Sequence, residues 1–88
     1  MVNKEVTVLN ATGLHARPAS MFVQEAGKYK SEINIIKGDK KINAKSIMGI
    51  MAAGLSKGTV LTIEADGEDE QTALAALVAL IESKFGEE

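Results

Sequence analysis

The chain has 88 residues, which is enough for one domain but too little to enclose a deep cleft. It carries 10 Lys and Arg against 12 Asp and Glu, and aromatic residues make up only 3% of it. Nucleic-acid binding normally requires a basic surface with stacking aromatics, so this composition argues against it. Without cysteine the chain forms no disulfide or thiolate metal site, and one histidine does not support zinc binding. No metal or cofactor is predicted.

The sequence shows no membrane or export signal. No stretch without a charge is longer than residues 46–56, and this length is far too short to span a membrane. The first residues, MVNKEVTV, carry charges where a signal peptide would have its apolar segment. We therefore expect a single domain over residues 1–88, located in the cytoplasm, with no membrane insertion.

The first half of the chain predicts a strand followed by a helix. Residues 2–9 alternate between apolar and polar as a half-buried strand does, and residues 10–13 are expected to be a loop. A helix is predicted over residues 18–27, with Pro18 in its first turn and Gly27 as its stop. The residues predicted to face the core from these elements are Val6, Val8, Ala19, Phe22, Val23 and Ala26.

A hairpin and a further strand are predicted in the middle of the chain. Residues 32–37 and 40–44 form two short strands, and Gly38 with Asp39 supplies the backbone freedom of a tight turn between them. The stretch TVLTIEAD, residues 59–66, is a fourth strand by its β-branched content and alternation.

Two more helices complete the pattern. Residues 46–54 form a short helix with Ser46 as its N-cap and Gly54 as its stop. The stretch DGEDEQTALAALVALIESKFG is a longer helix that ends at Gly86, with acidic residues in its first turn, where the helix dipole favours them. Its predicted buried stripe consists of Leu74, Leu77, Val78, Ile81 and Phe85.

The predicted order of elements, β-α-β-β-α-β-α, indicates an α+β fold. Two long amphipathic helices each have one apolar face, and one four-stranded sheet covers both on one side while its other side faces water. This arrangement is a two-layer, open-faced sandwich. The periodicity does not give the order of the strands in the sheet.

His15 stands just before the first predicted helix, where backbone N–H groups without partners and a partial positive charge favour an anion. Arg17 adds a fixed cation whose forked donors suit phosphate oxygens. Gly13 and Ala16 keep bulk away from the ring, while Leu14 is expected to anchor the loop in the core. The alternative is that His15 only hydrogen-bonds its surroundings.

The chemistry that suits this histidine is limited. A hydrolase or dehydrogenase needs several converging groups and some exclusion of water, and this chain has no serine–histidine–acid set and no glycine-rich nucleotide loop. Nucleophilic attack on a phosphoryl group demands less, because a partner enzyme can supply metal and electrostatics. The residues therefore favour a phosphoryl carrier over an enzyme.

Residues 46–56 are apolar around the whole short helix, and one face of it cannot be buried on a one-sided sheet. Some of Ile47, Met48 and Met51 should therefore lie at the surface as a patch for partners, although burial of all three is the alternative. A phosphate on Ser46 would lie at a helix N-terminus, which tolerates the charge. A solvated basic cluster is expected nearby from Lys40, Lys41 and Lys45.

The stretches GLHARPAS and KSIMGIMAAGLSKGT together resemble the HPr family, the histidine-containing phosphocarrier proteins of the bacterial phosphoenolpyruvate-dependent sugar phosphotransferase system. The resemblance covers essentially the whole chain. It implies three helices on one side of a four-stranded antiparallel sheet. It also implies that Nδ1 of His15 takes a phosphoryl group from enzyme I and passes it to IIA domains of sugar permeases, with Ala16 and Arg17 at the phosphoryl group.

The resemblance further implies a regulatory site at Ser46. In Gram-positive relatives a kinase/phosphorylase modifies this serine, and the modified protein acts with a catabolite control transcription factor. A regulatory paralogue lacks the active histidine, so His15 argues against that identity. The alternative is a regulatory module that works only through Ser46, Met48 and Met51. We expect a monomer, and the positions expected to contact partners are Thr12, Ser20, Ile47, Met48 and Met51.

Overall fold

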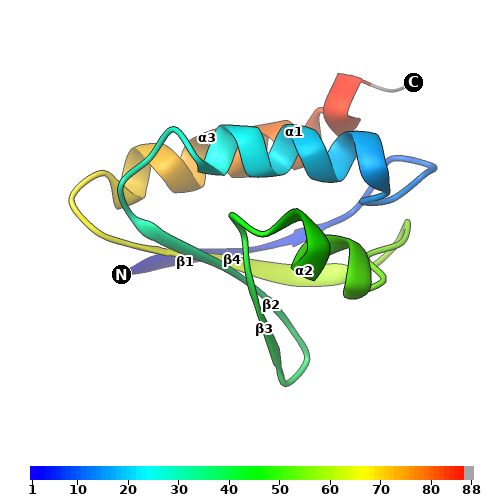
Figure 1. Ribbon diagram of the computed structural model, residues 1–88, viewed down its shortest axis with the longest axis horizontal. Helices are drawn as coiled ribbons and strands as arrows, with labels where there is room; N and C mark the ends of the chain where they lie inside the picture. Colours follow the sequence, from blue (N-terminus) through cyan, green and yellow to red (C-terminus); the bar gives the residue numbers. More distant parts are fainter. Residues whose placement is uncertain (87–88) are drawn as a thin grey trace.

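The computed structural model describes residues 1–86 and contains a four-stranded antiparallel sheet with three α-helices over one face (Figure 1). The predicted fold class is therefore confirmed. The strands are β1 (Val2–Thr7), β2 (Glu32–Lys37), β3 (Lys40–Asn43) and β4 (Val60–Asp66). The helices are α1 (Ala16–Ala26), α2 (Ile47–Ala52), α3 (Glu70–Glu82) and the short 3₁₀ segment η1 (Lys84–Gly86). Residues 87 and 88, the last of the expected domain, lie outside the described residues.

The strands lie in the order β1-β4-β2-β3, and every neighbouring pair is antiparallel. The first and last strands of the chain are therefore neighbours, with Val6 opposite Leu61. The β2–β3 hairpin closes through the predicted two-residue turn, in which Gly38 has a φ of +60°. Glycine adopts this left-handed conformation without the steric penalty that a Cβ would bring.

The core lies between the sheet and the helices. Alternate strand residues face the helices and are almost completely buried, such as Ile35 in β2 and Ile63 in β4. The long helices α1 and α3 lie side by side over this face and contribute Phe22 and Leu77, both fully buried (Figure 1). The opposite face of the sheet carries mostly polar side chains, with Val60 exposed among them. No helix within residues 1–86 is long and apolar enough to cross a membrane.

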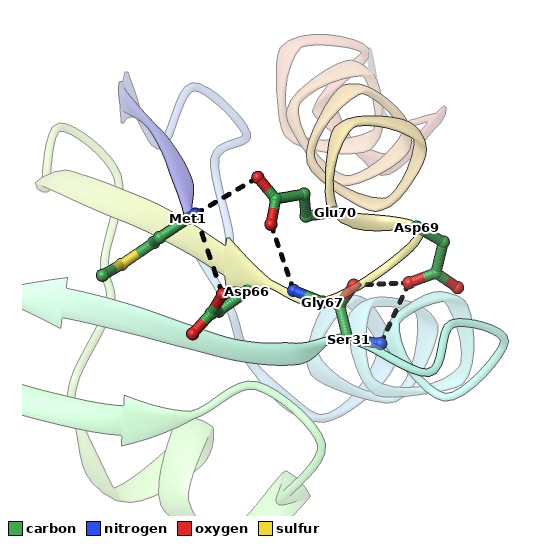
Figure 2. A network of polar contacts seen from close by, with 6 residues as sticks. All are labelled: Met1, Ser31, Asp66, Gly67, Asp69 and Glu70. Carbon is green, nitrogen blue, oxygen red and sulfur yellow. Dashed lines mark hydrogen bonds and ion pairs between the residues drawn. The ribbon is translucent and has the colours of Figure 1, made fainter.

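The start of α3 is held by carboxylates (Figure 2). Asp69 accepts hydrogen bonds from the Ser31 hydroxyl, from the Ser31 backbone amide at 3.0 Å and from the Lys30 amide at 2.9 Å. The Ser31 hydroxyl bond is the largest cause that lowers the pKa of the Asp69 carboxyl, followed by the Lys30 amide. Glu70 accepts from the Gly67 amide at 3.1 Å. The predicted acidic start of this helix therefore also ties α3 to the beginning of β2.

The end of α3 differs from the prediction. The α-helix stops at Glu82 and not at Gly86, because Lys84 and Phe85 adopt φ values of +58° and +55°. Phe85 still reaches the core, with 2% of its surface exposed, so the burial prediction is confirmed although the helical one is wrong. Leu74, predicted to be buried, is only partly so.

Lys40, Lys41 and Lys45, predicted to form a solvated basic cluster, are all exposed as expected, but the first two do not lie on one face of the sheet. Lys40 and Lys41 are neighbours in β3, so their side chains point to opposite faces of the sheet. Lys41 lies 3.3 Å from Glu64 in an ion pair, and the Lys45 ammonium donates to the Tyr29 carbonyl at 2.8 Å. Because side chains alternate between the two faces of a strand, lysines that are neighbours in the sequence point in opposite directions.

Candidate functional site

His15 is the N-cap of α1, and its side chain is exposed to solvent. Its carbonyl accepts from the Ala19 amide at 2.8 Å, so the helix begins at Ala16, slightly before the predicted start, and Pro18 lies in the first turn as expected. The amides of Ala16 and Arg17 have no acceptor within the helix. They therefore leave a partial positive charge beside the imidazole.

The loop before His15 is fixed by a close approach of two backbones. The Leu14 amide donates to the Leu55 carbonyl at 2.7 Å, and Gly13 is buried with a φ of +64°. A Cβ at Gly13 would lie 2.5 Å from the Leu55 oxygen and 2.7 Å from Ser56 Cα. The sequence predicts that Gly13 keeps bulk away from the His15 ring, but in the structure it allows the loop to pack on residues 55 and 56. Leu14 is buried as predicted.

A small pocket of about 100 Å³ connects His15 with the far end of α2. Its lining residues are Leu14, His15, Met51, Gly54, Leu55 and Ser56. Sites for drug-sized ligands usually measure roughly 300–1,000 Å³, so this pocket is too small for a sugar or a nucleotide. Its size fits a small group carried on the histidine itself.

The electrostatics of the α1 start favour an anion. Arg17 is exposed in the first turn, and within residues 1–86 neither His15 nor Arg17 takes part in an ion pair. No carboxylate lines the pocket. The guanidinium is therefore not neutralised in advance, and it can meet a phosphoryl group together with the amides of Ala16 and Arg17.

The second candidate region is α2. The Ser46 hydroxyl accepts from the Gly49 amide at 3.1 Å, which confirms the predicted N-cap. Ile50 is fully buried and anchors the helix. Exposed fractions of 38% for Ile47, 80% for Met48 and 48% for Met51 confirm that these apolar side chains lie at the surface.

The structure divides the predicted site residues between two elements. Those around α1 are Thr12, His15, Ala16, Arg17 and Ser20, and those of α2 are Ser46, Ile47, Met48 and Met51. Met51 joins the two groups because it lines the same pocket as His15, whereas Ser46 and Met48 do not. Ser20 is half-buried in α1, and Thr12 lies in the loop before it.

Sequence reasoning missed the surroundings of the histidine loop. Gly54, Leu55 and Ser56 line the pocket, although the sequence predicts only a helix stop at Gly54. Asn10 is almost completely buried, although the sequence predicts only a loop over residues 10–13. A glycine after an apolar helix predicts a turn, but the sequence does not show which other loop packs on that turn.

Together, the fold and the site define a class of protein: a small open-faced sandwich that presents one exposed histidine at a helix start, beside an apolar surface. Comparison with known proteins assigns the family. The family profile for the "PTS HPr component phosphorylation site" matches residues 2–83. The chain therefore belongs to the HPr family of phosphocarrier proteins of the phosphotransferase system.

Individual relatives agree over almost the full length. The chain is 52% identical to the HPr-like protein Crh of Halalkalibacterium halodurans, over 96% of this chain and 100% of that protein. It is 45% identical to the phosphocarrier protein HPr of Neisseria meningitidis, over 99% and 98%. HPr-C-His from Thermoanaerobacter tengcongensis has a similar structure, with a TM-score of 0.97, 57% identity and coverage of 100% and 99%. HPr of that organism has also been solved as a dimer, with a TM-score of 0.80, 56% identity and coverage of 99% and 100%.

Proposed function

We propose that His15 accepts a phosphoryl group from phosphorylated enzyme I and passes it to IIA domains of sugar permeases. The observation that carries this proposal is the exposed imidazole at the start of α1, beside free first-turn amides and an unpaired Arg17. In the step, a ring nitrogen, which we assign as Nδ1, forms a bond to phosphorus while the bond between phosphorus and the donor enzyme breaks. The amides of Ala16 and Arg17 and the guanidinium then stabilise the phosphoryl oxygens.

In this proposal the protein is a substrate of enzymes and not itself an enzyme. Its small pocket offers no room to enclose a second substrate and exclude water. The partner's active site must therefore close over the exposed ring and provide the remaining catalytic groups. We propose that the protein acts in the cytoplasm as a monomer. The dimer of the Thermoanaerobacter tengcongensis protein is the competing state, which sedimentation of this chain distinguishes.

The apolar patch on α2 is the proposed docking surface for these partners. Ile47, Met48 and Met51 are exposed, and Met51 brings the patch next to His15. Thr12 and Ser20 extend it on the α1 side. Methionine side chains adapt to different partner surfaces, which suits a protein that must bind both a donor and several acceptors. Met48→Lys should raise the KM of phosphorylated enzyme I for this protein and leave the melting temperature of the protein unchanged. A large loss of stability would contradict the surface role of Met48.

A second, regulatory function is favoured by the position of Ser46 and by the similarity to Crh proteins. We propose that a kinase/phosphorylase phosphorylates Ser46 and that the product binds a catabolite control transcription factor. A phosphate at the N-cap of α2 is electrostatically compatible with the helix start. His15 favours the carrier over the purely regulatory module, because a module of that kind has no use for an exposed imidazole.

A two-partner transfer assay tests the carrier proposal. The protein is mixed with phosphoenolpyruvate, magnesium and enzyme I, and the product is then offered to a IIA domain. We expect an acid-labile, alkali-stable phosphate that appears on this chain and moves to the acceptor. His15→Ala should take up none while keeping its cooperative melt. Label that persists in this variant would refute the assignment.

A further inference from the structure

Asn10 is a buried amide in the loop between β1 and α1, with only 1% of its surface exposed. Its Nδ2 donates to the Gly13 carbonyl at 2.6 Å and to the Thr12 hydroxyl oxygen at 3.3 Å. Its Oδ1 is buried and has no hydrogen-bond partner within residues 1–86. The side chain therefore makes directed contacts only to the loop that leads to His15.

A half-satisfied buried amide opposes folding, because the unpaired oxygen loses its hydrogen bonds to water. An apolar side chain of similar size would fill the same space without that loss. General stability therefore does not explain an asparagine at this position. What the amide provides beyond packing is a short bond to the Gly13 carbonyl.

The loop is held from two sides. Asn10 binds the Gly13 carbonyl, while the Leu14 amide binds the Leu55 carbonyl at 2.7 Å. Gly13 lies between these bonds, and its Cα packs so closely on the backbone of residues 55 and 56 that a Cβ would overlap it. His15 follows two residues later, and no side-chain cap bond fixes its ring. The orientation of His15 therefore depends on this doubly held loop.

We propose that Asn10 is a positioning residue for phosphoryl transfer, which fixes the histidine loop and thereby aims the His15 ring. This inference rests on the proposed carrier function. Displacements of about 1 Å at a reacting group can cost roughly a hundredfold in rate. The Asn10 side chain donates hydrogen bonds to Thr12 and Gly13 of the loop and none to Ile47, Met48 or Met51 of α2, so the loss should appear in kcat for phosphate acceptance far more than in KM.

The experiment compares four proteins as substrates of phosphorylated enzyme I: wild type, Asn10→Ala, Asn10→Asp and the control Asn34→Ala. Asn34 is the matched control because it is also a buried asparagine, 9% exposed, but lies in β2 between the core residues Ile33 and Ile35 and faces away from the helices. For Asn10→Ala we expect kcat to fall roughly tenfold with KM within about twofold of wild type. Hydrogen exchange of the Leu14 amide should also accelerate.

Asn10→Asp keeps the size of the side chain but replaces the donor with an ionised acceptor that repels the Gly13 carbonyl. It should show the same loss of kcat, and it carries the test if Asn10→Ala does not fold. A kcat within twofold of wild type in a folded Asn10 variant, or an equal loss in Asn34→Ala, would overturn the inference. If wild type itself takes up no phosphate on His15, the carrier proposal has failed, which is a different outcome.

Discussion

The starts of α1 and α2 are built in opposite ways. At α2, the Ser46 hydroxyl caps the helix by accepting from the Gly49 amide. At α1, the N-cap is His15, whose side chain makes no cap bond and lies in solvent. One helix start therefore uses its side chain for stability, whereas the other leaves its side chain and its first-turn amides without a hydrogen-bond partner within residues 1–86.

The α1 start needs other support because it lacks a side-chain cap. Gly13 and Leu14 fasten the preceding loop to Leu55, and Pro18 restricts the backbone in the first turn. None of these contacts neutralises the partial positive charge at the start of α1. A phosphate on His15 would therefore break no hydrogen bond within residues 1–86, whereas a phosphate on Ser46 would alter an atom that caps α2.

The largest expected effect is that of Gly13→Ala. The left-handed φ and the overlap with Leu55 and Ser56 should together cost about 3 kcal/mol of unfolding free energy. Gly38→Ala is the matched control, since Gly38 also has a positive φ but nothing lies within 4 Å of its added Cβ, and it should cost only about 1 kcal/mol. Urea unfolding measures both values. Equal losses would show that the loop packing is not what supports the α1 start.

Arg17→Ala should weaken phosphoryl transfer without weakening the fold. Charge-assisted hydrogen bonds contribute roughly 1.5–3 kcal/mol, so the rate of phosphate acceptance should fall at least about tenfold. The unfolding free energy should change by less than about 0.5 kcal/mol, because the side chain is exposed and unpaired. Phosphoryl-transfer assays measure the rate of phosphate acceptance, and urea unfolding measures the unfolding free energy separately. Loss of the cooperative melt would contradict the exposed placement.

Two variants of Ser46 should separate the capping role of its hydroxyl from the effect of a negative charge at that position. Ser46→Ala removes the cap and should cost about 1 kcal/mol of unfolding free energy, with normal phosphate acceptance on His15. Ser46→Asp should retain the stability, because aspartate also caps well, but its charge should reduce acceptance from enzyme I. Unchanged kinetics in Ser46→Asp would argue against coupling between the two helix starts through the docking surface.

The smallest effect concerns the start of α3, where Asp69 links the helix to Ser31 and Lys30. These bonds lower the pKa of Asp69, so the stability they give is fully present above the ordinary aspartate pKa of about 3.9. That stability is lost as the pH falls from there through the lowered pKa of the folded state. Urea unfolding between pH 7 and 2 should show a steeper acid loss in wild type than in Asp69→Asn, and parallel curves would exclude the effect.

The helix starts were largely predictable because local chemistry sets them. Pro18 and Ser46 mark the first turns of α1 and α2, and the two-residue turn at Gly38 follows from local backbone freedom. The apolar excess around Met48 also predicted an exposed patch, since one short helix cannot bury every face. These features depend on neighbours in the sequence.

What the sequence did not reveal depends on distant contacts. The strand order pairs β1 with β4, the first strand of the chain with the last, and the packing of Gly13 on Leu55 joins segments about forty residues apart. The buried state of Asn10 depends on the same packing. The helix α3 ends at Glu82, earlier than the apolar spacing suggested, because Lys84 and Phe85 adopt left-handed backbone conformations. Phe85 is nevertheless buried, so its burial does not require a continuous helix.

The most direct test is a pair of amide NMR spectra of the protein before and after treatment with enzyme I and phosphoenolpyruvate. If the open start of α1 holds the transferred group, one phosphate appears on His15 and the largest shifts fall on the amides of Ala16 and Arg17. The Gly49 amide, bonded to Ser46, should stay in place. A phosphate on another residue, or shifts centred on α2, would contradict the account.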